Sequence, residues 1–214
     1  MRHSTVRQGV IEYNLHMNLS LTGVPLPLRF KPDTPMSDDE LMRFCAANDV
    51  LRVERDANGE ILVMTPAGSR TGRKNAYLTQ VLGTWADQDG RGYAFDSNTG
   101  FTLPDGSMRS PDAAWVLAPR WDAMSDEDKD RFSPLCPDFI IELRSQSDSL
   151  PVLEAKMVQW IANGAQVAWL IDPERQVVAI YRPGQQLEVH HYPTSVRGDG
   201  PVAGFELVMA RIWE

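Results

Sequence analysis

Two acidic residues lie inside segments that otherwise have the character of buried β-strands. Asp112 stands in the run SPDAAWV, residues 110–116, and Glu142 stands in the run PDFIIELRS, residues 137–145. Short apolar runs rich in aromatic and β-branched residues are typical of buried strands. A carboxylate in such a run costs free energy unless it is paired, hydrogen-bonded or bound to a metal. We therefore expect both acids to have partners in the folded chain.

The alternation of side chains along a strand predicts how these acids point. Residues two apart share a face, so Glu142 points with Ile140 and Arg144, and Asp112 points with Ala114. If the two strands are neighbours, the two carboxylates converge. Carboxylate oxygens and water are the ligands that magnesium prefers, and the backbone carbonyl of Leu143 is a further candidate ligand.

A lysine follows at a helical position that faces the same region. Lys156 lies three residues after Leu153 and four before Trp160, so all three share one face of a predicted helix. A lysine beside metal-bound water can orient or deprotonate it and can neutralise charge that develops on phosphate. Taken alone, each residue has a simpler interpretation. Lys156 can extend past Trp160 to water. Glu142 can pair with Arg144, and Asp112 can cap the turn after Pro111.

Composition limits the class of protein. The chain has 214 residues, 43% hydrophobic and 23% charged, as in an ordinary globular protein, with a formal net charge of −8 that gives no general attraction to nucleic acid. Its two cysteines, Cys45 and Cys136, are far apart and predict neither a disulfide framework nor a zinc site. We find no membrane-spanning segment and no signal peptide, so we expect a cytoplasmic protein.

The order of the expected elements predicts an α/β (α+β) class with a mixed central sheet flanked by helices. Residues 1–35 contain four prolines and are expected to form an extended arm, and residues 36–214 to form one domain. Helices are expected from Ser37 to about Asn48, from Thr71 to about Ala86 and from Pro151 to Ala162. A hairpin is expected over 51–64, and strands over 93–95, 101–103, 110–116, 137–145, 167–171, 177–181, 187–191 and 205–209.

These residues resemble the PD-(D/E)xK nuclease superfamily, with Pro111-Asp112 followed by Glu142-Leu143-Arg144. Arg144 stands where that pattern has a lysine, and Lys156 matches the position of branches whose lysine has moved to the next helix. The chain is further similar to the Uma-type family of restriction endonucleases over about residues 37–184. The similar segments are 64–66, 71–76, 95–101, 109–115, 136–145, 156–157 and 169–173.

This resemblance implies a restriction-endonuclease-like fold and hydrolysis of DNA phosphodiester bonds with Mg2+ (or Mn2+). It implies that Asp112 and Glu142 bind the metal and that Lys156 acts on the attacking water. The chain departs from the family at Arg70, which stands where an acid is expected.

Candidate substrate-binding residues are basic. Arg70, Arg73 and Lys74 form a cluster at the start of a predicted helix, where they can hold a phosphate backbone or simply face solvent, and Arg144 is a fourth candidate. A homodimer is expected, because an enzyme that cuts two strands often needs two sites. Two other functions stay open: a binding or scaffold protein that has lost catalysis, and a phosphodiesterase for a substrate other than DNA.

Overall fold

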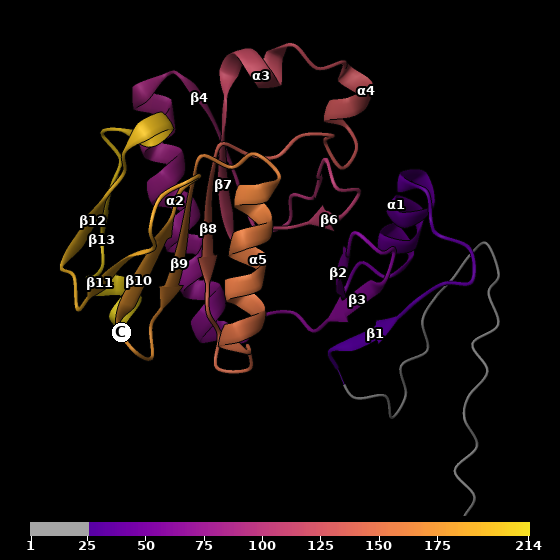
Figure 1. Ribbon diagram of the computed structural model, residues 1–214, viewed down its shortest axis with the longest axis horizontal. Coiled ribbons are helices and arrows are strands. Elements are labelled where there is room, and N and C mark those ends of the chain that lie inside the picture. Colours follow the sequence, from indigo (N-terminus) through magenta and orange to yellow (C-terminus); the bar gives the residue numbers. More distant parts are fainter. Residues whose placement is uncertain (1–25) are drawn as a thin grey trace, which may run out of the picture.

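A six-stranded mixed sheet forms the centre of the molecule (Figure 1). The computed structural model describes residues 26–214. The strands run in the order β11-β10-β9-β8-β7-β4, and β8 and β9 are its parallel pair. Their bounds are β4 (Gly92–Phe95), β7 (Ala113–Leu117), β8 (Phe139–Leu143), β9 (Val167–Asp172), β10 (Val177–Tyr181) and β11 (Glu188–His191).

Helices cover both faces of this sheet. The long helix α2 (Ser69–Asp89) packs on one face with Phe139 and Trp169, and α5 (Leu150–Ala162) packs on the other with Ile140. Adjacent residues of β8 thus belong to different cores, as alternation along a strand requires. The face with α2 is completed by β12 (Ser195–Arg197), β13 (Glu206–Val208) and α6 (Ala210–Trp213). The class predicted from the sequence is confirmed.

A second, smaller sheet stands beside the central one. It has the order β1-β3-β2-β6-β5 and carries α1 (Asp38–Ala47), with a core of its own around Leu41 and Ile61. Figure 1 shows its hairpin and α1 as a small lobe next to α5. Its strands are β1 (Leu28–Phe30), β2 (Arg52–Arg55), β3 (Ile61–Met64), β5 (Phe101–Thr102) and β6 (Met108–Arg109). The small lobe therefore contains chain from both sides of α2.

The predicted elements differ from the observed ones mainly at their ends. Ser37 caps α1 in a reciprocal capping box with Glu40, as expected. The predicted strand over 110–116 begins only at Ala113, so Asp112 lies just before β7. The predicted connector over 119–135 contains two short helices, α3 (Ala118–Asp122) and α4 (Asp126–Lys129).

The predicted arm over 1–35 lies mostly outside the described residues. Within its described part, β1 pairs antiparallel with β3, so Leu28 lies opposite Val63. Among residues 26–214, the helices are each too short or too polar to cross a membrane. Cys45 and Cys136 are both free thiols, as their spacing predicted.

We expect Gly92→Ala to destabilise the protein by about 1–3 kcal/mol. Gly92 pairs with Leu117 at the edge of the central sheet, and an added Cβ there would overlap the Val116 carbonyl and the Trp115 indole. Urea unfolding measures the loss.

Gly83→Ala is the matched control for this substitution. Gly83 lies within α2, and an added Cβ meets no atom within 4 Å. Because glycine is a poor helix former, this variant should gain about 0.5–1 kcal/mol. Equal stability changes in the two variants would contradict the proposed close packing at Gly92.

Candidate active site

The two acids predicted from the sequence lie together where β7 and β8 meet. The strands pair antiparallel with Ala113 opposite Ile141, and this register continues to Asp112 opposite Glu142. Both side chains are buried. Asp112 Oδ2 accepts a hydrogen bond from the backbone N–H of Leu143 at 2.8 Å. The pairing of β7 with β8 therefore brings the two carboxylates together, and the hydrogen bond of Asp112 to Leu143 links the two strands.

The other oxygen of Asp112 contacts the first turns of α2 and the small lobe. Oδ1 accepts a hydrogen bond from Asn75 Nδ2 at 2.8 Å and lies 3.6 Å from the Arg52 guanidinium. These contacts differ from the simpler interpretation, in which Asp112 capped the turn after Pro111. Asn75 is itself buried, and its Oδ1 has no hydrogen-bond partner among the described residues. Sequence reasoning missed both Asn75 and Arg52.

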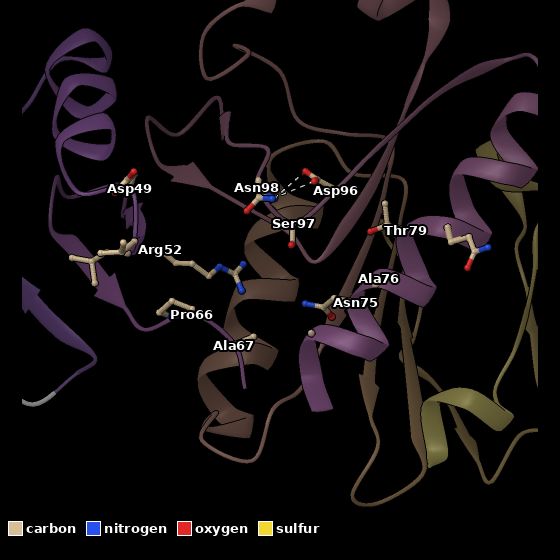
Figure 2. A pocket seen from close by; sticks show the side chains of 14 residues that line it. Asp49, Arg52, Pro66, Ala67, Asn75, Ala76, Thr79, Asp96, Ser97 and Asn98 are labelled. Atoms are coloured by element: carbon tan, nitrogen blue, oxygen red, sulfur yellow. Dashed lines mark hydrogen bonds between the residues drawn. The ribbon is translucent and has the colours of Figure 1, made fainter. Parts of the chain in front are cut away.

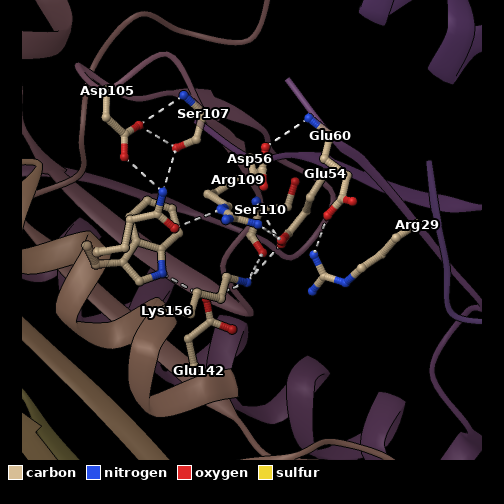
Figure 3. Close-up of polar contacts among 12 residues, drawn as sticks. Arg29, Glu54, Asp56, Glu60, Asp105, Ser107, Arg109, Ser110, Glu142 and Lys156 are labelled. Carbon is tan, nitrogen blue, oxygen red and sulfur yellow. Dashed lines mark hydrogen bonds and ion pairs between the residues drawn. The ribbon is translucent and has the colours of Figure 1, made fainter. Parts of the chain in front are cut away.

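Lys156 lies between two carboxylates, as Figure 3 shows. Its Nζ is 2.8 Å from Glu142 Oε1 and 2.8 Å from Glu54 Oε1, and it also donates to the Ser110 carbonyl at 3.3 Å. The side chain is only 14% exposed. The helix face predicted from Leu153 and Trp160 therefore does turn Lys156 inward, and the alternative in which it extends to water is wrong.

Glu54 is the acid that the sequence did not reveal. It lies on β2 of the small lobe and is buried, and its second oxygen accepts from Arg109 on β6 at 2.9 Å. Gln159 on α5 accepts in turn from Arg109 at 3.1 Å. The sequence around Glu54 gave only a weak indication of a buried acid, because an acid in a hairpin strand usually faces solvent. Only the packing of the small lobe against α5 buries this face of β2.

Burial and the neighbouring charges give Glu142 and Glu54 different pKa values. Burial, partly offset by Lys156, raises the pKa of Glu142 to about 7, and the nearby Asp112 and Glu54 also raise it. Burial opposes ionisation of Glu54 too, but Lys156 and Arg109 outweigh it and lower the pKa to about 2. Burial lowers the pKa of Lys156, yet Glu142 and Glu54 raise it overall. Lys156 and Glu54 are thus a charged pair, and Glu142 changes protonation near neutral pH.

The contacts of Glu142 leave room for another ligand. Both of its hydrogen-bonding neighbours, Lys156 and the Trp160 indole N–H at 3.0 Å, use Oε1. Arg144 does not pair with Glu142, as one interpretation had it, but with Asp172 at 2.8 Å. Within residues 26–214, no group of three or more His, Cys, Asp or Glu side chains has an arrangement that could hold a metal by itself.

The four basic candidates separate into two sets. Arg70, Lys74 and Arg144 line one cavity, which has a volume of about 160 Å3 and lies beside Leu143. Arg73 is not among the lining residues; it is exposed and pairs at 3.2 Å with Glu214, which lies at this cavity. The cluster that was continuous in sequence is therefore divided by the helix, because consecutive residues of α2 face different directions.

Glu142 makes stability depend on pH in a defined direction. Its folded pKa lies above the ordinary value, so the folded chain holds its proton between pH 4.5 and about 7 while the unfolded chain loses it. The free energy of unfolding should therefore fall as pH rises through this window. Glu142→Gln should remove that fall, which amounts to a few kcal/mol at about 1.4 kcal/mol per pKa unit.

Urea unfolding from pH 4 to pH 8 without divalent metal measures this difference. Glu154→Gln is the control, since it makes the same chemical change at an exposed position on α5. The stability of the control should follow that of the natural chain at every pH. If the stability of Glu142→Gln depends on pH in the same way as that of the natural chain and of Glu154→Gln, Glu142 does not hold its proton in the folded chain.

Comparisons with known proteins agree with this architecture. A family model described as "Uma2: Putative restriction endonuclease" matches residues 38–210. The crystal structure of "a putative nuclease belonging to DUF820" from Anabaena variabilis is 21% identical and covers 84% of this chain and 98% of its own, with a TM-score of 0.64. That similarity shows the fold. A cryo-EM structure of a DrdV–DNA complex is 13% identical over 55% of this chain and 10% of its own; its TM-score of 0.36 supports no inference. No curated protein matches the sequence significantly.

The family match covers most of the chain and includes Asp112, Glu142 and Lys156. The neighbour in Anabaena variabilis supports the nuclease-like fold independently of close sequence identity. We conclude that this chain belongs to the Uma2 restriction-endonuclease family and has a restriction-endonuclease-like fold.

Proposed function

We propose that this protein is a metal-dependent endonuclease that hydrolyses phosphodiester bonds of DNA. The observation that carries the proposal is the convergence of Asp112, Glu142 and Lys156 from two paired strands and one helix. Family membership and the fold both support a nuclease. The choice of DNA and of a divalent metal goes beyond them and rests on the chemistry of the site.

The donor set fits Mg2+ or Mn2+. Asp112, Glu142 and the Leu143 carbonyl are oxygen ligands, which these ions prefer. Each Asp112 oxygen accepts one hydrogen bond, and Glu142 Oε2 accepts none among the described residues, so lone pairs remain. Magnesium commonly binds one or two carboxylates and fills its other positions with water and substrate phosphate. A bound metal would acidify its water and neutralise charge on the phosphate.

Lys156 contributes a positive charge to this reaction. Because Glu142 and Glu54 raise its pKa, the ammonium stays charged at neutral pH. A charged ammonium can orient the attacking water and stabilise the charge that develops on phosphate, whereas it cannot accept a proton. Glu54 is a positioning residue, since it acts by holding Lys156 rather than by reaching the phosphate.

The acidic balance of the chain requires local attraction for DNA. A net charge of −8 gives no general affinity, so binding must come from basic residues beside the site and from the metal. Arg52 next to Asp112 and the set Arg70, Lys74 and Arg144 provide such residues. An enzyme that cleaves both strands of a duplex often uses two sites, and a homodimer is part of the proposal.

Asp112→Asn should lower the rate of DNA cleavage on the order of 100-fold, because it removes a charge at the metal while keeping the shape of the side chain. The assay follows plasmid, linear duplex and single-stranded DNA in Mg2+ and in Mn2+. RNA and a small phosphodiester test the alternative substrate. Asp126→Asn, an exposed substitution on α4, serves as the control and should cleave like the natural chain.

Cleavage that persists in Asp112→Asn would come from a contaminant or another site. If neither DNA, RNA nor the small phosphodiester is cleaved while DNA still binds, the alternative of a binding protein on a nuclease fold is correct.

Glu54→Gln should lower the cleavage rate about 10–100-fold, as loss of residues that support a metal site commonly does. Because Glu54 raises the pKa of Lys156, its removal should also move the alkaline limit of activity to lower pH. A pH–rate profile measures both effects. A purely structural role for Glu54 would lower the rate without moving the profile, and that result contradicts the proposed role.

A further inference from the structure

Two cavities are each lined by a residue that contacts Asp112. Figure 2 shows the larger one, about 620 Å3, between the small lobe and α2, with Arg52 and Asn75 on its wall. The smaller one, about 160 Å3, lies at the start of α2 and at the ends of β8 and β9, with Leu143 on its wall. Because Asn75 and Leu143 each donate a hydrogen bond to Asp112, both cavities adjoin the residues that hold this carboxylate.

The smaller cavity contains a buried lysine that forms no ion pair with the described residues. Lys74 is 6% exposed, and among the described residues it makes no hydrogen bond or ion pair. Burial, and then the neighbouring cations Arg70 and Arg73, lower its pKa. A charged group that is largely buried without a partner is unfavourable. Such a side chain is placed to receive an anion.

The carboxylates around this cavity already have partners. Asp172 and Glu174 pair with Arg144 at 2.8 and 3.8 Å, and Glu214 pairs with Arg73. Among the described residues that line the cavity, Lys74 and Arg70 are therefore the cations without an ion pair, although Glu214 lies near enough to raise the pKa of Lys74.

The backbone adds to the attraction for an anion. The cavity lies at the N-terminus of a 21-residue helix, whose N-cap residue, Gly68, provides no side-chain cap. Amide groups at such an end are free to donate and carry the positive end of the helix dipole. The hydroxyls of Thr71 and Ser145 line the same cavity. Donors therefore surround it from α2 and from the segment after β8, which suits a tetrahedral oxyanion.

We propose that this cavity binds a phosphate group of the nucleic-acid strand, next to the phosphodiester at the active site. The inference rests on the proposed nuclease function for the identity of the strand, but the phosphate site itself rests on Lys74, Arg70 and the start of α2. It assigns three of the four basic candidates to one task and leaves Arg73 outside it.

The test compares Lys74→Gln with Arg91→Gln, both in an Asp112→Asn background that does not cut. Arg91 follows the other end of α2 and pairs with Asp89, so the control has the same change of charge. Inorganic phosphate should raise the melting temperature of the Arg91→Gln control. The Lys74→Gln variant should bind phosphate at least tenfold more weakly than this control. Calorimetry with a short oligonucleotide should show a salt dependence that is smaller by about one counterion for Lys74→Gln.

Two oligonucleotides identify the phosphate. If Lys74 matters equally for strands with a 5′-hydroxyl and a 5′-phosphate, the site binds the backbone; if only the phosphorylated strand depends on it, the site binds a strand end. Either result supports the proposal. If Lys74→Gln and Arg91→Gln bind phosphate and both strands alike, the proposal is overturned.

Folding and catalysis are controlled separately. Lys74→Gln removes a buried charge that has no ion pair, so this variant should fold. Arg70→Gln changes an exposed residue of the same cavity and should also weaken phosphate binding. If phosphate binding depends on Lys74 but the natural chain cleaves no nucleic acid, the phosphate site stands and the nuclease proposal fails. If the natural chain cleaves DNA and these variants bind phosphate normally, the nuclease proposal stands and the phosphate site fails.

Discussion

The ion pairs of Lys156 connect the central sheet, the small lobe and α5 at the candidate active site. One carboxylate, Glu142, belongs to the central sheet, and the other, Glu54, belongs to the small lobe, so a single ammonium on α5 joins three parts of the fold. Glu54 and Glu142 are buried and the Lys156 side chain is 14% exposed, and charges so placed are tolerated when they are paired and hydrogen-bonded. The position of the small lobe is therefore coupled to the electrostatics of the site, because moving β2 away would take the carboxylate of Glu54 from both Lys156 and Arg109.

The same arrangement assigns different tasks to chemically similar groups. Glu54, with its pKa near 2, is permanently ionised and balances Lys156 and Arg109. Glu142, with its pKa near 7, lies in a site where a further cation would favour its charged form. Asp112 is held by the Leu143 amide and by Asn75, which fixes its orientation between the two cavities. A metal, a nucleic-acid strand and the protein's own lysine thus have separate places in the proposed site.

Local patterns predicted much of this structure because they depend on neighbours in sequence. The capping box at Ser37, the hairpin over 51–64 and the alternation through Ile140 and Glu142 each arise from contacts within a few residues. Element ends were less accurate, since the last turns of α2 depend on packing, and β7 starts one residue after Asp112. Glu54 was missed because nothing near it in sequence distinguishes a buried acid from an exposed hairpin acid.

The sequence by itself determined which chemistry this chain can support: two acids in buried strands, a lysine on an inward helix face, and no general positive charge. These follow from residue type and periodicity. Only the tertiary structure decided that Lys156 has a second acid, Glu54, that Arg144 pairs with Asp172 instead of Glu142, and that Arg73 is separated from Lys74. The physical reason is that burial and ion pairing depend on segments brought together from distant parts of the chain, such as the 102 positions between Glu54 and Lys156. The two costly acids of the strands were visible in the sequence, but their partners were not.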